Sequence, residues 1–348
     1  MNTERTDYIN ILLMIVSTIL AFYLPFELFL FSYAILGPLH YLTEIGWLHQ
    51  RNYFATGKND YYILIFLGLL ITLALLVNQP QETQFLISLF GSDPQAMQTW
   101  GKFLAEWCPA FVFMAFVVAF GMSFLKKNIH KVLVIIIGLI LAVLLKEVSF
   151  YTITFSVFFP TIVHVWLFTG IFMLGGALKS REFSGHLSFI AFVLCSFCFF
   201  LIRKGPSFQP VSEYVQHSFM QSNFGSVNTA LFNLIYDSKK PLIFDSPKGL
   251  MIQRFIAFAY TYHYLNWFSK TNVIRWHQVP KKWLITALGL WASSIALYIY
   301  DFKIGFLALF FLSIMHVFLE FPLNYKSLAQ IRDAIFKKQE KAMSGKSA

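Results

Sequence analysis

Apolar runs of about 20 residues recur along most of the chain, and short polar segments separate them. An α-helix rises about 1.5 Å per residue, so such a run is long enough to cross the roughly 30 Å hydrocarbon core of a bilayer. The pattern predicts an all-α fold, a polytopic integral membrane bundle of ten transmembrane helices. The predicted spans cover residues 9–23, 26–47, 61–77, 104–124, 132–146, 154–178, 187–202, 250–268, 283–300 and 304–325.

Three of the predicted boundaries between spans depend on a proline or on charged residues. The stretch 9–42 is too long for one crossing, and Pro25 gives it a point at which to turn, because proline starts helices but interrupts their interior. Lys146 and Glu147 separate the fifth span from the sixth. Asp301 and Lys303 separate the ninth span from the tenth.

The composition agrees with a membrane protein. Hydrophobic residues make up 57% of the 348 residues and charged residues only 13%, and Phe alone occurs 41 times. These proportions exclude a soluble enzyme, a nucleic-acid-binding protein and a disordered chain. The net charge of +10 does not indicate nucleic acid here, because Lys and Arg lie between the apolar runs, where they orient the spans. The predicted partner is the lipid bilayer.

Charge asymmetry between the loops predicts the orientation of the spans. With ten spans, the short basic loops and the basic tail fall on one side, which the positive-inside rule makes cytoplasmic. We therefore expect both termini in the cytoplasm and the long connection 203–248 on the opposite side, with a short interfacial helix at 229–236. The predicted organisation is a single transmembrane domain over 1–325 and a basic cytoplasmic tail over 326–348, in a cell membrane such as the bacterial inner membrane.

Ionisable side chains within membrane spans are costly, so each is a candidate functional group. The second, sixth, eighth and tenth spans each contain one histidine: His40, His164, His263 and His316. These spans run in the same direction, and counting from their outer ends places all four residues roughly 15–21 Å deep. A lone intramembrane histidine more often bonds a neighbouring helix than a metal. Four at one depth favour a shared metal site.

Two carboxylates accompany these histidines. Glu44 follows His40 by four residues and Glu320 follows His316 by four, so each lies about one turn away on nearly the same helix face. Either carboxylate is suited to bind a metal or to accept the second N–H of a ligating imidazole. Four imidazoles with one or two carboxylates suit Fe(II), Zn or Cu better than Mg or Ca. Fe(II) with an open position would bind O₂.

Several polar and aromatic residues near the histidines are candidates for the lining of a pocket: Tyr41, Tyr262, Tyr264 and Asn266. The alternative is that they belong to the aromatic belt that membrane proteins place at the lipid–water interface. The many Phe residues suit lipid-facing surface and core, and they also suit a channel for a long apolar substrate.

The segment Gly37-Pro38-Leu39-His40-Tyr41-Leu42-Thr43-Glu44 resembles the Gly-x-Pro-His-Gly-x-x-Asp signature of the Brp/Blh family. Members of that family are membrane proteins that cleave β-carotene to retinal with a histidine-bound non-haem iron. In this chain the proline is displaced by one position, Tyr41 stands in place of the second glycine and Glu44 in place of the aspartate. The resemblance implies that His40 is an iron ligand and that Glu44 is its partner.

These observations favour an integral membrane, non-haem iron oxygenase that acts with O₂ on a lipid-soluble substrate. Carotenoid cleavage is the specific form that the resemblance implies. Two alternatives stay open. The histidines are also compatible with axial ligation in a haem-binding membrane redox protein, and a relay of histidines and carboxylates near the midplane is typical of a proton-coupled transporter. The sequence identifies no protein partner.

Overall fold

A computed structural model describes residues 3–79, 83–84, 87–88, 93–202, 211–236, 243–270 and 279–344, with side chains as far as Phe336. This part of the chain is helical and contains no β-strand. Eight of its helical segments are long and apolar enough to cross a bilayer. The all-α prediction is confirmed, and the helices are compatible with a multi-pass membrane protein. The count of ten spans and the cytoplasmic position of the termini stay predictions.

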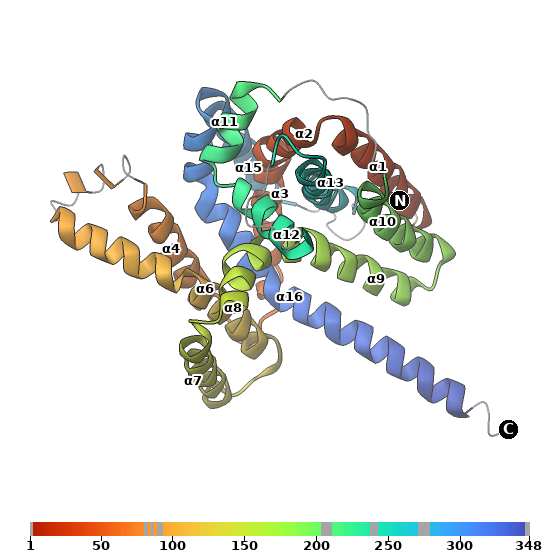
Figure 1. The fold of residues 1–348 in the computed structure, drawn as a ribbon. Coiled ribbons are helices and arrows are strands. Elements are labelled where there is room, and N and C mark those ends of the chain that lie inside the picture. Colours follow the sequence, from red (N-terminus) through yellow and green to blue (C-terminus); the bar gives the residue numbers. More distant parts are fainter. Residues whose placement is uncertain are drawn as a thin grey trace. The chain divides into compact units, whose positions relative to one another are not determined.

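A helix or an unbroken helical run overlaps each of the ten predicted spans (Figure 1). Two of the runs include a π-helical segment, η1 or η3. The elements in chain order are α1 (Thr3–Tyr23), α2 (Pro25–Phe31), η1 (Ser32–Leu36), α3 (Gly37–His49), α4 (Tyr61–Val77), α6 (Pro94–Phe124), α7 (Asn128–Leu145), α8 (Ser149–Ile153), η3 (Thr154–Phe168), α9 (Thr169–Ser180), α10 (Phe183–Leu201), α13 (Pro247–Ser269), α15 (Lys281–Tyr300) and α16 (Phe302–Ser344).

The three predicted boundaries coincide with helix ends. Leu24 leaves the helical region, with φ −132° and ψ 56°, and Pro25 occupies the first turn of α2, where its missing N–H is not needed. α7 ends at Leu145, one residue before the predicted charged pair. Asp301 is extended between α15 and α16, with φ −156° and ψ 128°. Proline and charged residues thus end the apolar helices where the sequence predicts.

The described part of the long connection 203–248 contains two complete helices, α11 (Glu213–Gln221) and α12 (Gly225–Tyr236). α12 includes the short helix that the sequence predicts at 229–236. α11 has no counterpart among the predicted elements, although Ser212 caps it by accepting a hydrogen bond from Val215 N at 3.4 Å. Residues 203–210 and 237–242 of the connection lie outside the described residues.

α16 continues well beyond the predicted end of the tenth span and takes in most of the predicted tail. Between Lys326 and Ser344 the sequence is rich in Ala, Lys, Gln and other helix-favouring residues and contains neither Gly nor Pro. The segment 326–348 is therefore largely a continuation of the helix, and its cytoplasmic location stays a prediction.

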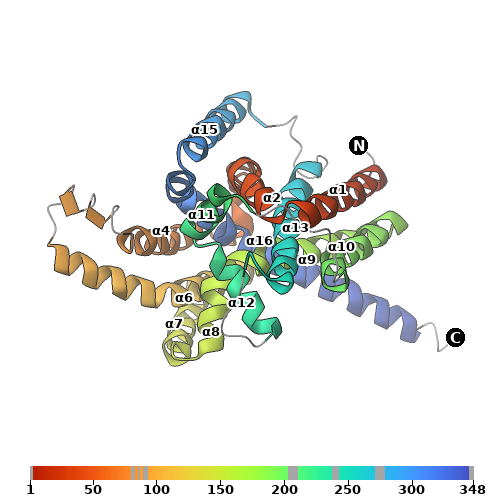
Figure 2. The same cartoon turned by 45° about the horizontal axis from the view of Figure 1, so that its top comes forward.

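The chain forms two compact units, of which the first comprises Met1–His40, Ile162–Lys303 and Asn324–Ala348. The central helix of this unit is α13, which lies beside α1, α2 and α10 (Figures 1 and 2). Because its neighbours cover α13 nearly all round, it tolerates polar residues that a lipid-facing helix would not. Two of them bond the backbone at the turn between α1 and α2: Arg254 Nε donates to Phe22 O at 3.1 Å, and Gln253 Nε2 donates to Pro25 O at 3.4 Å.

The second unit comprises Tyr41–Thr161 and Ile304–Leu323. Within it, α6 packs along α4 and along α7 (Figure 2). A small residue permits the close contact between α6 and α7, because a Cβ atom added to Gly138 would lie 2.8 Å from Val117 Cγ1. The single transmembrane domain predicted over 1–325 stays a prediction.

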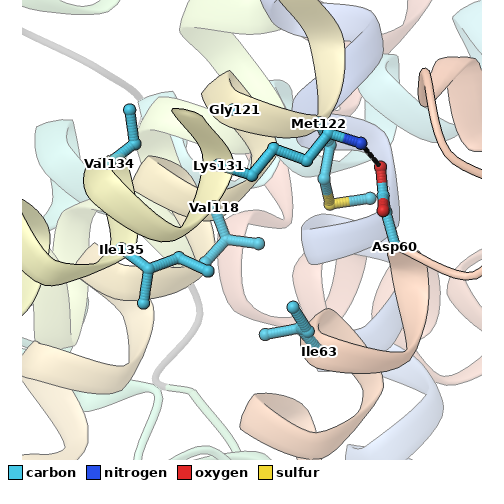
Figure 3. Close-up of a pocket in the computed structure, with 8 residues that line it drawn as sticks. All are labelled: Asp60, Ile63, Val118, Gly121, Met122, Lys131, Val134 and Ile135. Atoms are coloured by element: carbon cyan, nitrogen blue, oxygen red, sulfur yellow. Dashed lines mark hydrogen bonds and ion pairs between the residues drawn. The ribbon is translucent and has the colours of Figure 1, made fainter. Parts of the chain in front are cut away.

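An ion pair ties the loop before α4 to α7 within the second unit (Figure 3). Lys131 Nζ lies 2.6 Å from Asp60 Oδ2, and the two side chains are only 12% and 19% exposed. The same carboxylate oxygen accepts a hydrogen bond from Gly57 N at 3.0 Å. In the same loop, Thr56 N donates to Met122 O at 2.8 Å. These contacts fix the connection between α3 and α4.

We expect Gly138→Ala to destabilise the packing of α6 against α7. The added methyl group would press on Val117, a branched side chain with little freedom to move, and overpacking of this kind costs about 1–3 kcal/mol. The thermal denaturation midpoint of the detergent-purified protein should fall. Gly176→Ala is the matched control, since nothing lies within 4 Å of its Cβ position. Equal midpoints for both variants and the wild type would contradict this packing.

Candidate metal centre

Two π-helical segments adjoin the candidate histidines. η1 ends just before Gly37, whose N–H donates to Ser32 O in the i→i+5 pattern of a π-helix. η3 contains Pro160, which has no N–H to donate, and His164. π-helical turns are rare and frequently occur at functional sites. Their wider turn changes which residues share a face of the helix.

Gly37 lets the start of α3 approach α13 closely. A Cβ atom at this position would lie 3.3 Å from the hydroxyl oxygen of Tyr264, which is tighter than ordinary van der Waals contact. The close approach brings His40, three residues further along α3, next to His263 on α13. A larger residue at position 37 would press on the hydroxyl end of Tyr264.

His40 and His263 face each other directly. Their Nε2 atoms are 3.1 Å apart, and their ring centroids are 4.7 Å apart with an interplanar angle of 74°. The side chains are 1% and 6% exposed. Two nitrogens that bind one ion at about 2.1 Å, with an angle of about 90–110° between them, lie about 3.0–3.4 Å apart. The contact is a hydrogen bond in this structure, and the same spacing also suits two ligands of one metal ion.

His164 brings a third imidazole to this pair from η3. Its ring centroid lies 4.8 Å from that of His263 at an interplanar angle of 66°, and 1% of the side chain is exposed. His40, His164 and His263 all belong to the first compact unit, although they come from three helices that are distant in sequence.

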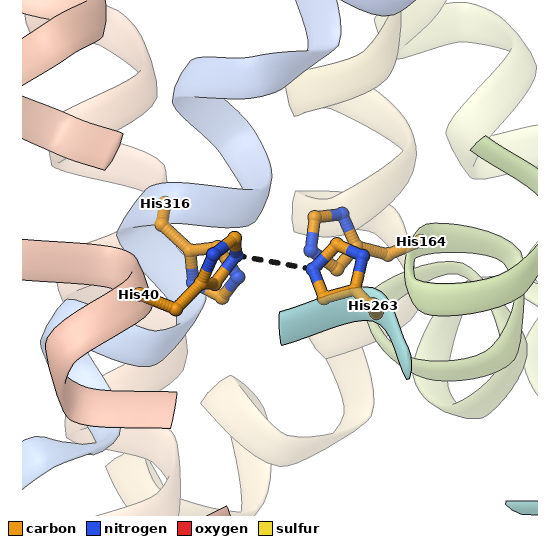
Figure 4. A group of neighbouring side chains, drawn as sticks. All are labelled: His40, His164, His263 and His316. Carbon is orange, nitrogen blue, oxygen red and sulfur yellow. Dashed lines mark hydrogen bonds between the residues drawn. The ribbon is translucent and has the colours of Figure 1, made fainter. Parts of the chain in front are cut away.

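His316 on α16 is the fourth member of the group (Figure 4). One ring nitrogen from each of the four histidines lies within 4.8 Å of the others, and His316 is 4% exposed. The structure thus brings together the four histidines that the sequence singles out. Four buried imidazoles of this kind could hold a metal ion, and their chemistry alone does not select one metal.

A hydroxyl group completes the surroundings of His263. Thr169 Oγ1 lies 2.9 Å from His263 Nδ1, and only 1% of Thr169 is exposed. Thr169 is absent from the residues that the sequence predicts for the site. A threonine five residues after a histidine carries no signal unless the π-helical register of η3 is known.

Glu44 and Glu320 are both buried, each at 2% exposure, one helical turn beyond His40 and His316. Among the described residues, the group of mutually close ligand atoms consists of histidines and includes neither carboxylate. A carboxylate is costly to bury unless other groups compensate it. The functions of Glu44 and Glu320 as additional ligands or as hydrogen-bond partners of the histidines stay predictions.

Two of the predicted pocket residues place their rings against candidate ligands. Tyr41 and His316 have ring centroids 5.6 Å apart, and Tyr264 and His40 have ring centroids 5.2 Å apart. Both tyrosines are almost completely buried. They therefore limit how far these imidazoles can turn.

The other two predicted pocket residues are also buried on α13. The hydroxyl of Tyr262 donates to Asn10 Oδ1 at 3.1 Å and so joins α13 to α1. Asn266 is 5% exposed and lies about one turn beyond His263. The role of both in lining a pocket stays a prediction.

Two other histidines, His49 and His186, make single polar contacts outside the group of four. His49 Nδ1 lies 3.1 Å from the hydroxyl of Tyr53. His186 is exposed at the start of α10, and its Nδ1 lies 2.9 Å from Glu182 O. Neither belongs to the close group of four.

Comparisons with known proteins yield no relative. No protein-family model matches the chain, and neither a curated protein nor a solved structure matches it.

We expect the purified protein to bind one transition-metal ion per chain, measured by elemental analysis after anaerobic loading with Fe(II). His164→Ala removes one of four imidazoles and should weaken binding by about 100-fold or more, since even residues behind the ligands contribute about 10–100-fold. His186→Ala is the matched control and should bind like the wild type. Unchanged affinity in His164→Ala would contradict a shared site.

Proposed function

We propose that this chain is an integral membrane, non-haem oxygenase in which the four histidines hold Fe(II). The observation that carries the proposal is the convergence of four buried imidazoles in a bundle of apolar helices. Imidazoles that packed independently between helices would not be expected to place one nitrogen each within 4.8 Å of the others. A shared ion gives these costly polar groups a common partner.

An all-histidine ligand set suits a first-row transition metal. Imidazole nitrogen binds iron, copper and zinc, whereas Mg and Ca prefer oxygen. Bound Fe(II) would supply the O₂ chemistry that amino-acid side chains lack. The contribution of the protein is to orient the imidazoles and to keep them away from water, and their exposures of only 1–6% support this.

The preference for iron, and for a carotenoid substrate, comes from the resemblance of segment 37–44 to the Brp/Blh signature. Two residues of that signature have physical roles in this structure. His40 belongs to the group of four, and Gly37 permits the close approach of α3 to Tyr264 on α13. The segment that carries the resemblance thus contributes one of the four clustered histidines.

The spacing of the imidazoles favours a non-haem ion over haem. Two axial histidines bind haem iron from opposite faces of a porphyrin that is about 10 Å wide. His40 Nε2 and His263 Nε2 are 3.1 Å apart, and all four ligand nitrogens fall within 4.8 Å of one another. Axial nitrogens about 4 Å apart are normal across haem iron, but the porphyrin fills the plane around that iron. Haem could therefore bind only two of four imidazoles this close together, and the other two would overlap the ring.

A lipid-soluble substrate agrees with the surroundings of the ligands. The ring of His40 contacts the rings of Tyr264 and Trp267, with centroids 5.2 and 5.5 Å away. Aromatic surroundings of this kind exclude water and suit an extended apolar or conjugated molecule, such as a polyene that enters from the bilayer. Glu44 and Glu320 would orient the imidazoles that precede them by one turn.

We expect the Fe(II)-loaded protein in detergent to consume O₂ when β-carotene is added. Cleavage of one double bond by one O₂ gives two carbonyl products, so the visible polyene absorption should disappear and a shorter conjugated aldehyde should appear by chromatography. His164→Ala should lower the rate by about 100-fold or more, because the reaction depends on the bound ion. His186→Ala should keep the wild-type rate.

Two results would contradict the proposal in different ways. Folded protein that binds iron but neither consumes O₂ nor changes carotenoids would rule out a carotenoid oxygenase. Folded protein that binds no metal, but carries protons into liposomes in a manner that depends on Glu44, would favour the transporter alternative.

A further inference from the structure

One imidazole of the candidate site is held from both sides. Thr169 Oγ1 lies 2.9 Å from Nδ1 of His263, and His40 Nε2 lies 3.1 Å from Nε2 of the same ring. All three side chains are buried, with exposures of 1% for Thr169 and His40 and 6% for His263. The ring of His263 cannot flip without breaking both contacts.

The π-helical register of η3 explains why Thr169 reaches this position. His164 lies within η3, and Thr169, five residues later, is the first residue of α9. Five residues of an α-helix turn through about 500°, which leaves the two side chains about 140° apart. A π-helix has about 4.4 residues per turn, so the same five residues turn through about 410°. The two side chains are then only about 50° apart around the helix axis. One helical run therefore presents a candidate ligand and a hydroxyl group on neighbouring faces.

We propose that Thr169 is a positioning residue that sets the tautomer of His263 for metal binding. A neutral imidazole binds a metal through Nε2 only when its proton lies on Nδ1. The oxygen of Thr169 accepts the hydrogen bond from that Nδ1–H and leaves the lone pair of Nε2 directed toward the group of four. This role rests on the proposed metal site and adds to it a residue that does not touch the ion.

A hydroxyl group suits this position because it both donates and accepts. It donates to Nδ1 of His263 when the proton lies on Nε2 and is shared with His40. It accepts from Nδ1–H when Nε2 binds an ion. A hydroxyl is also uncharged, so it fixes the ring without placing a further buried charge beside the histidines.

A second buried hydroxyl contact in the same unit supplies a matched control. Thr261 Oγ1 lies 2.8 Å from Ser32 Oγ, and Thr261 is 3% exposed on α13, two residues before His263. Replacing Thr261 by Val removes a hydrogen bond of the same kind from the helix that carries His263. If weaker helix packing alone lowered the affinity for the metal, Thr261→Val should lower that affinity as well.

The test is a Co(II) titration of the detergent-purified full chain, followed by the visible absorption of bound Co(II). Thr169→Val keeps the shape of the side chain but removes the hydroxyl, and it should weaken Co(II) binding by about 10–100-fold. Thr169→Ser keeps the hydroxyl and should bind within about threefold of the wild type. Thr261→Val should also bind within about threefold.

A spectroscopic measurement tests the tautomer directly. In Zn(II)-loaded protein with ¹⁵N-labelled histidine, the wild type and Thr169→Ser should show a protonated Nδ1 on His263 that is protected from exchange with D₂O. In Thr169→Val this proton should exchange at least about tenfold faster, because it has lost its acceptor. Loss of the signal in His263→Gln assigns it.

Three outcomes would overturn the inference, and they differ from one another. Equal Co(II) affinity in the wild type and Thr169→Val removes the positioning role but leaves the metal site intact. Equal weakening in Thr169→Val, Thr169→Ser and Thr261→Val shows that packing, not the hydroxyl, is responsible. Failure of the folded wild type to bind Co(II) overturns the metal site and this role together.

Discussion

A buried imidazole has two ring nitrogens that water does not reach, and leaving either without compensation is costly in an apolar interior. His263 meets this constraint with Thr169 at one nitrogen and His40 at the other. The same constraint shapes α13, which carries Gln253 and Arg254 as well as His263 and is covered by its neighbours nearly all round. The architecture around the candidate site therefore shelters these polar groups from lipid and gives His263, Gln253 and Arg254 hydrogen-bond partners.

The helices must also direct the histidines and Thr169 toward one another. Two π-helical departures from the regular α-helix, η1 and η3, contribute to this. η1 ends where Gly37 lets α3 approach α13, and His40 follows within one turn. η3 accommodates Pro160 and turns His164 and Thr169 onto neighbouring faces of one run. A regular α-helix through either segment would direct these side chains differently. Helix register is thus part of the site and not a local irregularity.

Much of this organisation follows from the sequence, because membrane spans are governed by length and polarity. Pro25 and Asp301 end helices where predicted, and the four histidines can be grouped by counting residues from the ends of parallel spans. Other features of the site and the fold depend on helix register and on side-chain contacts, which hydropathy and residue spacing do not give. The contact of Thr169 with His263 can be recognised only once the π-helical register is known. α11 is a short amphipathic helix in a polar connection, and hydropathy does not predict such a helix. The roles of Glu44 and Glu320 depend on contacts that spacing alone does not give.

X-ray absorption at the iron edge of the Fe(II)-loaded protein tests the central claim most directly. Shared ligation by His40, His164, His263 and His316 predicts a first shell of nitrogen or oxygen atoms at about 2.1–2.2 Å, with the outer-shell scattering of about four imidazole rings and no sulfur. A spectrum with one imidazole or none, or with the scattering of a porphyrin, would contradict the account. In that case the four buried histidines would have to be explained without a common non-haem ion.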